Sequence, residues 1–232
     1  MNNSMVMVSS YIHLLFLLVW IFSGEASEGQ VRVAKFPLQC SFNVTITANQ
    51  VSDAENAFPP RVRTIGVYYD YVNKRGRADI QEGYEAAKVY LRRYEEGVDM
   101  EYMVRLPPID DCKRSNLLEV MPYPLIPDTN FVKQMACPGG GQQCDYFLFT
   151  DYDTKVHIYM DSSTGAPVQL VQEAEVDKQD VPMLTYDYHD VVLGAPDKSH
   201  FELASLDKQV EDCDLHAGGF PYLHLFHYFV KL

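Results

Sequence analysis

The chain has 232 residues and is acidic, with 32 Asp and Glu against 19 Lys and Arg and a formal net charge of −13. Its length suits one domain with a full core, whereas two domains would each be small. Contacts to phosphate need clustered positive charge, and the sequence has no such cluster, so a nucleic-acid partner is not expected. The 16 Tyr residues and the Val-rich segments favour strands over helices.

The N-terminal segment 1–26 is predicted to be a signal peptide. Residues 14–22 form an uninterrupted apolar run, and Gly24 and Ala26 provide the small residues that signal peptidase requires. The run is shorter than the about 20 residues of a membrane span. Because no Lys or Arg precedes it, an uncleaved anchor is the alternative. We expect a protein that is secreted or that enters an endomembrane or lysosomal lumen.

Two features agree with an oxidising compartment. Asn43 begins an Asn-Val-Thr acceptor for N-glycosylation. Five cysteines lie beyond the signal, and their odd number allows at most two bridges and leaves one thiol. They lack the paired Cys-x-x-Cys spacing of a zinc site. The five are Cys40, Cys112, Cys137, Cys144 and Cys213.

The first predicted elements are strands. Residues 40–48 alternate strictly between apolar and polar, which is typical of a strand with one buried face. Asn43 then falls on the outward face, where a glycan fits. A second strand over 61–72 leads into a turn at 73–76, and the chain returns through 77–80.

The middle of the chain is less regular. Strands are predicted at 87–94 and 101–106, and the proline-rich residues 122–127 form a connection. Residues 131–135 are predicted to be a short helix, because Asp and Thr before them can cap its free amides. Residues 137–144 contain three consecutive glycines and must form a loop.

Four later strands complete the pattern, at 146–150, 155–160, 167–173 and 183–192. Eight or so strands joined by hairpin turns, with one or two short helices, predict an antiparallel all-β protein.

Several motifs lie in a distinctive order over roughly residues 60 to 213. A strand ending in an aromatic residue and Asp precedes a basic turn. A Tyr-containing strand then runs into a Cys, and a late strand ends in Gly-x-x-Asp-x-x-x-Phe before a final Cys. The residues are Tyr69, Asp70, Lys74, Arg75, Gly76, Arg77, Tyr102, Cys112, Tyr188, His189, Asp190, Gly194, Asp197, Phe201 and Cys213. This order resembles the ependymin-related family.

The resemblance implies two curved sheets that form a half-open barrel around a deep apolar pocket, a shape shared with bacterial lipoprotein carriers. It implies a hydrophobic or lipid ligand and a Cys112–Cys213 bridge. The family's other cysteines do not map onto this chain. The second bridge therefore stays open: Cys137 and Cys144 pair with each other, or one of them pairs with Cys40. The β domain is expected over 27–217.

Alternating apolar residues give a candidate pocket. They form coherent faces on the predicted strands, which line a cavity if the resemblance holds or fill a dry core between two sheets if it does not. The candidates are Phe42, Val44, Ile46, Ile65, Val67, Tyr69, Tyr71, Val89, Leu91, Val156, Ile158, Met160, Val168 and Leu170.

The segment Asp187-Tyr-His-Asp190 looks like a catalytic or metal centre. However, the sequence lacks the Gly-x-Ser-x-Gly and His-Glu-x-x-His motifs, so a solvated strand face is the preferred interpretation. Calcium is the alternative, because carboxylates of adjacent turns and strands can bind it. The calcium candidates are Asp151, Asp153, Asp187 and Asp190.

The aromatic segment 218–232 is too short to span a membrane. It is predicted to be a last buried strand, or else a flap that touches a membrane surface at the mouth of the pocket. The sequence thus predicts a secreted, non-enzymatic glycoprotein that carries a hydrophobic small molecule or lipid and needs no cofactor. The alternative is an extracellular adhesion or interaction module that uses calcium.

Overall fold

The computed structural model describes residues 32–51, 61–83, 86–117, 119–126 and 128–220. The predicted signal peptide and most of the predicted C-terminal strand or flap lie outside these residues. The description below concerns the unit that begins at Arg32. Among the described residues, no helix has the length and apolar character needed to cross a membrane.

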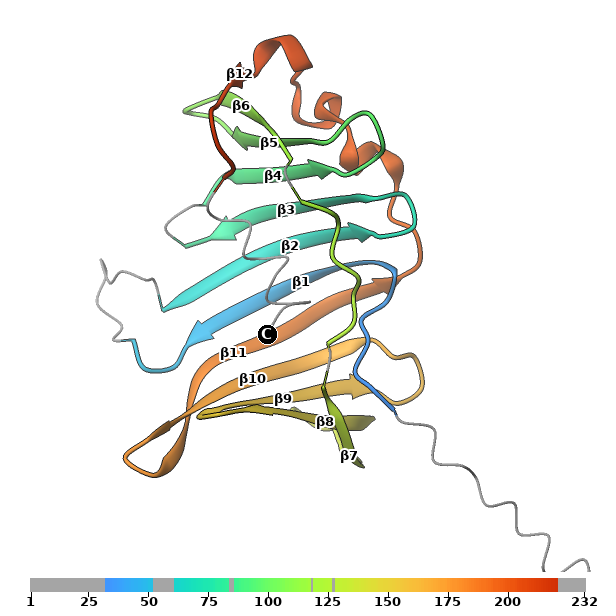
Figure 1. Ribbon diagram of the computed structural model, residues 1–232, viewed down its shortest axis with the longest axis vertical. Coiled ribbons are helices and arrows are strands. Elements are labelled where there is room, and N and C mark those ends of the chain that lie inside the picture. Colours follow the sequence, from blue (N-terminus) through green and yellow to red (C-terminus); the bar gives the residue numbers. More distant parts are fainter. Residues whose placement is uncertain (1–31, 52–60, 84–85, 118, 127, 221–232) are drawn as a thin grey trace, which may run out of the picture. The chain divides into compact units, whose positions relative to one another are not determined.

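The described residues form one sheet of twelve strands (Figure 1). All neighbouring strands are antiparallel except β12, which runs parallel to β6. The strands are β1 Gln39–Ala48, β2 Val62–Asp70, β3 Arg75–Glu82, β4 Lys88–Arg93, β5 Met100–Arg105, β6 Asp111–Asn116, β7 Asn130–Ala136, β8 Gln143–Asp151, β9 Thr154–Asp161, β10 Pro167–Val176, β11 Gln179–Leu193 and β12 Asp214–Leu215. The all-β, mainly antiparallel prediction is confirmed.

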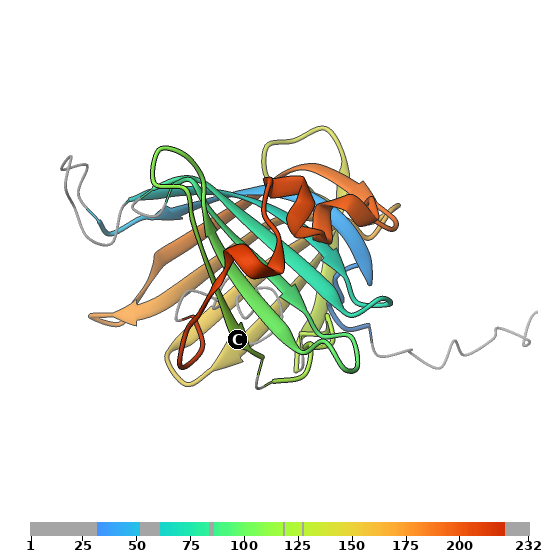
Figure 2. The same ribbon diagram turned by 90° about the horizontal axis from the view of Figure 1, so that it is seen from above.

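The strand order is β12-β6-β5-β4-β3-β2-β1-β11-β10-β9-β8-β7. Strands β1 to β6 are therefore one meander of consecutive hairpins, and β7 to β11 are another. The two meanders join where β1 pairs with β11, with Val44 opposite Tyr188. The expected two curved sheets are thus one continuous curved sheet, which is not closed because β12 and β7 lie at its two edges (Figure 2).

The predicted helix at 131–135 is wrong, because these residues belong to β7, whose backbone pairs with β8. At the edge of the sheet β7 is largely exposed on both faces, so its sequence lacks alternation. Strand β6 was not predicted either. The helical residues among those described are three short 3-10 turns after β11, at Lys198–Phe201, Leu203–Leu206 and Val210–Asp212.

The sheet has apolar residues on both faces, because successive side chains of a strand point to opposite sides. On β4, Tyr90 belongs to a large cluster, whereas Val89 and Leu91 belong to a smaller one. We call the face that carries the large cluster the inner face and the opposite one the outer face. Val89 and Leu91, predicted to line the pocket, therefore lie on the outer face, a correction that follows from their alternation with Tyr90.

The 3-10 turns cover the outer face at strands β3 to β6. Phe201 is 1% exposed and packs in the smaller cluster. His200 stacks on Tyr68 at 4.0 Å between ring centroids, and its carbonyl accepts a hydrogen bond of 3.0 Å from Arg77. The Cys112–Cys213 disulfide joins this covering segment to β6, as the resemblance implied.

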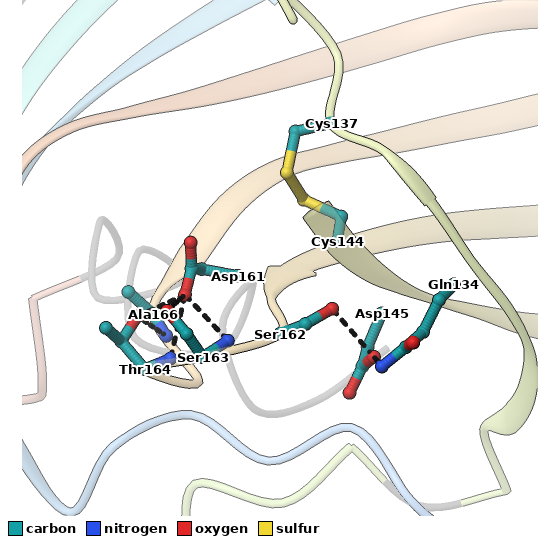
Figure 3. The surroundings of a disulfide bond; sticks show 9 residues. All are labelled: Gln134, Cys137, Cys144, Asp145, Asp161, Ser162, Ser163, Thr164 and Ala166. Atoms are coloured by element: carbon teal, nitrogen blue, oxygen red, sulfur yellow. Dashed lines mark hydrogen bonds between the residues drawn. A yellow bond between two sulfur atoms is a disulfide. The ribbon is translucent and has the colours of Figure 1, made fainter. Parts of the chain in front are cut away.

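The other cysteines are also settled by the structure. Cys137 and Cys144 form a disulfide across the β7–β8 hairpin (Figure 3). Cys40 is a free thiol, buried in the large cluster. Burial raises the pKa of this thiol to about 12.

Candidate ligand-binding face

Most of the predicted pocket residues come together on the inner face. Tyr71 is half-buried and packs against their cluster, and Val168 is also half-buried. The ten that are buried in the large cluster are Phe42, Val44, Ile46, Ile65, Val67, Tyr69, Val156, Ile158, Met160 and Leu170. Strands of both meanders contribute to them, so the inner face is continuous across the β1–β11 seam.

Among the described residues, two extended segments cover the inner face, and residues 122–127 were predicted only as a connection. We call residues 32–38 and 119–126 the strap. They contribute Ala34, Phe36, Met121 and Ile126 to the large cluster from the side opposite the sheet. The second segment, which lies between β6 and β7 in the chain, runs across the other strands of the sheet (Figure 1). The four apolar residues of the strap have no regular spacing, so the sequence showed no periodic pattern that would have predicted their burial.

The strap is held by a few polar contacts. Lys35 and Leu125 form an isolated antiparallel bridge, and the amide of Phe36 donates to the carbonyl of Pro124 at 2.9 Å. The hydroxyl of Tyr69 on β2 donates to the carbonyl of Pro122 at 2.7 Å. The two strap segments therefore pair with each other over one short antiparallel bridge, whereas the strap is held to the sheet at separate points.

Thr129 fixes the two segments of the strap to each other. Its hydroxyl oxygen accepts from the amide of Ala34 at 2.9 Å, and the hydroxyl donates to the carbonyl of Ile126 at 3.1 Å. The Thr129 side chain is buried, at 2% exposure. A buried backbone group without a partner costs about 1–3 kcal/mol, so this hydroxyl stabilises the contact between the two strap segments.

The first residue of the strap is anchored at the β7–β8 hairpin. Arg32 forms an ion pair with Asp145 and lies over the Phe131 ring, 4.2 Å from its centroid. Asp145 also accepts hydrogen bonds from Gln134 at 3.0 Å and from Ser162 at 2.9 Å (Figure 3). This carboxylate thus joins the strap to β7, β8 and the β9–β10 turn.

A hollow of about 300 Å³ lies near that turn. Its residues include half-buried Val168 and Val191, buried Tyr188, and two carboxylates, Asp161 and Asp190. The Asp161 carboxylate is already used by the turn, since it accepts from the amide and the hydroxyl of both Ser163 and Thr164 (Figure 3). These bonds lower the pKa of Asp161.

The inner face ends in charged residues on β4 and β5. Arg92 and Glu101 lie directly opposite each other, as Tyr90 and Met103 of the large cluster do. The Arg92 guanidinium is 3.2 Å from the Glu101 carboxylate, and it donates to the Tyr94 hydroxyl at 2.8 Å. On each strand, the inner face therefore changes from an apolar residue to a charged residue.

Glu119 of the strap completes this group, which we call the polar end: Arg92, Glu101 and Glu119. Glu119 forms an ion pair with Arg92 and has a side chain that is 38% exposed. Arg92 and Glu101 are 5% and 2% exposed. Burial raises the pKa of Glu101, and the Phe220 amide and Arg92 oppose this shift. A hollow of about 200 Å³ lies against the polar end.

Asp187 and His189 of the Asp-His stretch lie on the outer face, where β11 pairs with β1, whereas Tyr188 between them belongs to the large cluster of the inner face. Asp187 accepts a hydrogen bond of 2.7 Å from Gln169, and His189 is exposed. Asp151 and Asp153 lie at the β8–β9 turn. Among the described residues, no group of three or more His, Cys, Asp or Glu side chains is placed to hold a metal ion, so the structure does not gather the four calcium candidates.

Asn43 lies on the outer face, as its alternation predicted. It is half-buried, donates to Asp190 at 3.0 Å and accepts from Gln81 at 3.1 Å. Its glycosylation stays a prediction.

A polar chain on the outer face was missed by the sequence analysis. The Tyr146 hydroxyl is 2.8 Å from Nδ1 of His157, whose Nε2 is 2.9 Å from Glu173. The three residues come from β8, β9 and β10, and no spacing within one strand could have indicated them. Burial raises the pKa of Tyr146, with further contributions from Tyr159 and Glu173, so this hydroxyl stays protonated.

No family model and no curated protein sequence matches the chain. Among solved structures, an uncharacterized conserved protein from Thermus thermophilus is similar, with a TM-score of 0.50, 8% identity, and coverage of 77% of this chain and 89% of that chain. This similarity shows a shared fold.

Two further structures show weaker similarity. In the MucA/MucB complex of Pseudomonas aeruginosa, the matched chain has a TM-score of 0.47 and 12% identity, with 78% of this chain and 58% of that chain covered. The LolA superfamily protein NE2245 from Nitrosomonas europaea has a TM-score of 0.33 and 14% identity, with 73% and 92% covered. Nothing about this chain is inferred from these two lower scores.

Proposed function

We propose that the protein binds a hydrophobic molecule or lipid between the inner face and the strap. The observation that carries this proposal is the difference in how the two layers are held together. The sheet is hydrogen-bonded strand to strand, whereas the strap is held by a few separate contacts. Strands from β1 to β3 and from β8 to β11 present a continuous apolar face, and in the described residues the strap, two extended segments held at separate points, lies over it. A cover of this kind can be displaced while the hydrogen bonds of the sheet remain intact.

The energetics support an apolar ligand. Moving an acyl chain out of water contributes about 0.8 kcal/mol for each buried CH₂ group. Displacing the strap costs the few hydrogen bonds that hold it, each with a net value of about 0.5–1.5 kcal/mol. Because the ligand lies between the strap and the inner face, Phe36 and Ile126 exchange their contacts with the sheet for contacts with the ligand. A chain of ordinary lipid length then offsets the cost of the lost hydrogen bonds.

The proposal treats the protein as a carrier or binding protein rather than an enzyme, and as a secreted glycoprotein. Two disulfides, Cys112–Cys213 and Cys137–Cys144, support an oxidising compartment. The ependymin-related resemblance of the sequence agrees with an apolar ligand and remains part of this proposal.

Native mass spectrometry of the full-length protein purified from its own host tests this function. We expect a bound apolar molecule that is lost on denaturation and is found by solvent extraction. A protein that is repeatedly free of ligand and has no affinity for a fluorescent fatty acid would contradict the proposal.

A pair of variants on one strap segment gives the matched control. Ile126 is 0% exposed and Val120 is 87% exposed. We expect Ile126→Glu to weaken binding of the fluorescent fatty acid at least tenfold, because it places a charge against the inner face, and Val120→Glu to leave binding unchanged. Far-UV circular dichroism checks that the sheet forms in both.

The second candidate is an extracellular interaction module. It is favoured by β7, which lies at an edge of the sheet and is largely exposed, including Val132 at 47%. Such an edge offers backbone groups to a partner strand. A calcium-dependent rise in melting temperature, together with the absence of any bound apolar molecule, would favour this function.

A further inference from the structure

The polar end interrupts an otherwise apolar surface. Along β4 the inner face passes from Tyr90 to Arg92, and along β5 from Met103 to Glu101. Tyr94, which is half-buried against the large cluster, accepts a hydrogen bond from Arg92 at 2.8 Å. The polar end and the apolar inner face are therefore parts of one continuous surface, one part charged and the other apolar.

Burial of these charges is not explained by stability. Withdrawing an ion pair from water costs several kcal/mol per ion, and apolar residues at the same place are often equally or more stabilising. The group holds two carboxylates and one guanidinium, a formal charge of −1. Nε of Arg92 is buried and has no hydrogen-bond acceptor among the described residues. A buried N–H donor without an acceptor adds to the cost of burying this group.

The adjoining hollow has the size of a small head group. Its volume is about 200 Å³, and its lining includes all three residues of the polar end together with Asn116, Leu117 and Gly219.

The chain at 218–220 shapes this hollow. The amide of Phe220 donates to Glu101 at 2.9 Å, and the hydroxyl of Ser115 donates to the carbonyl of Gly218 at 2.7 Å. A Cβ at Gly219 would lie 3.3 Å from the Glu101 carboxylate, closer than an ordinary contact. The absence of a side chain at Gly219 therefore keeps the hollow open beside Glu101.

We propose that the polar end is a head-group subsite for an amphiphile that carries a protonated amine. The ammonium binds the half-exposed carboxylate of Glu119, while the apolar chain lies along the inner face. The net negative charge disfavours an anionic head such as a carboxylate. This inference rests on the proposed function, because it names the head group of the same ligand.

Three amphiphiles with the same chain length separate the possibilities: 2-aminododecan-1-ol, 1,2-dodecanediol and dodecanoic acid. Each displaces the neutral fluorescent probe N-phenyl-1-naphthylamine from the full-length protein at pH 7, where the amine is protonated. We expect the amino alcohol to bind about tenfold more tightly than the diol, a difference of about 1.4 kcal/mol, and the acid to bind more weakly than both.

The variant Glu119→Gln tests the assignment. Its side chain is partly exposed, so the fold should tolerate the change, and we expect the preference for the amino alcohol to disappear while the diol binds as before. Glu175→Gln is the matched control, since Glu175 is exposed on β10, and it should keep the preference.

The outcomes distinguish this inference from the proposed function. Equal binding of all three amphiphiles, tighter binding of the acid, or a preference that survives Glu119→Gln would overturn the subsite and leave apolar binding standing. If none of the three displaces the probe and no bound molecule is found in the native protein, both fail.

Discussion

Glu101 illustrates how one buried residue links the fold to its proposed function. It is 2% exposed, lies between Arg92 and the amide of Phe220, and has a pKa that burial raises above the ordinary value of 4.5. The side chain is thus more easily protonated in the folded protein than in the unfolded chain. Burial therefore disfavours the charged form of Glu101, which agrees with the proposed role in binding rather than in stability.

This raised pKa gives a pH dependence with a definite sign. Between the unfolded pKa near 4.5 and the higher folded one, the folded state binds the extra proton, so the free energy of unfolding falls as pH rises through this window. We expect Glu101→Gln to lack this fall, so that its stability relative to the natural protein improves from pH 4 to pH 7.

Urea titrations of both proteins at several pH values measure this difference. Glu175→Gln controls for the loss of one carboxylate, because Glu175 is exposed on β10. Parallel curves for the natural protein and Glu101→Gln would show that burial does not perturb this carboxyl.

At the scale of the elements, the strap is the part of the fold that the proposed function requires to move. Thr129→Val keeps the shape of the buried side chain and removes the hydroxyl shared by Ala34 and Ile126. We expect the variant to lose about 1–3 kcal/mol of stability. We also expect a bound fluorescent fatty acid to dissociate several-fold faster, because the two strap segments separate more easily.

Stopped-flow release of the fluorescent fatty acid measures the second effect. Thr150→Val is the control, since Thr150 is an exposed residue of β8, and its release rate should match that of the natural protein. A slower or unchanged release from Thr129→Val would contradict a strap that moves for ligand exchange.

The elements also show what the sequence can predict. Strand β1 was predicted nearly to the residue, because one face is buried and the other is not over its whole length. Strand β7 was mistaken for a helix, because an edge strand that is exposed on both faces has no period. Alternation defines which residues share a face, but not which of the two faces is the inner one, so Val89 and Leu91 were assigned to the wrong side.

The candidate site was predictable only in its apolar part. The strands that carry Arg92 and Glu101 were predicted, yet their ion pair depends on the register of β4 against β5. Glu119, Phe220 and Ala34 reach the inner face through irregular segments. Their positions follow from long-range contacts that no local pattern of residues reveals.

At the scale of the whole molecule, the two disulfides constrain very different lengths of chain. Cys112 and Cys213 are 101 residues apart in sequence, whereas Cys137 and Cys144 are 7 apart. In the chain-entropy model these bridges stabilise by about 4.7 and about 2.5 kcal/mol. We therefore expect the Cys112→Ala/Cys213→Ala double variant to lose more stability than Cys137→Ala/Cys144→Ala.

Chemical unfolding of both double variants compares the losses. The free thiol of Cys40 is present in each and cancels in the comparison. A larger loss from removing the short bridge would mean that the β7–β8 hairpin, rather than the covering of the outer face, limits the stability of the sheet.

The seam between β1 and β11 sets the order in which the molecule can be completed during synthesis. Strand β1 pairs with β2 as soon as both have left the ribosome, but its other edge waits for residues 184–193. Until then the nascent chain presents a nearly finished half-sheet with an open, apolar margin. Newly made protein is therefore most exposed to aggregation and to chaperone capture before β11 has emerged.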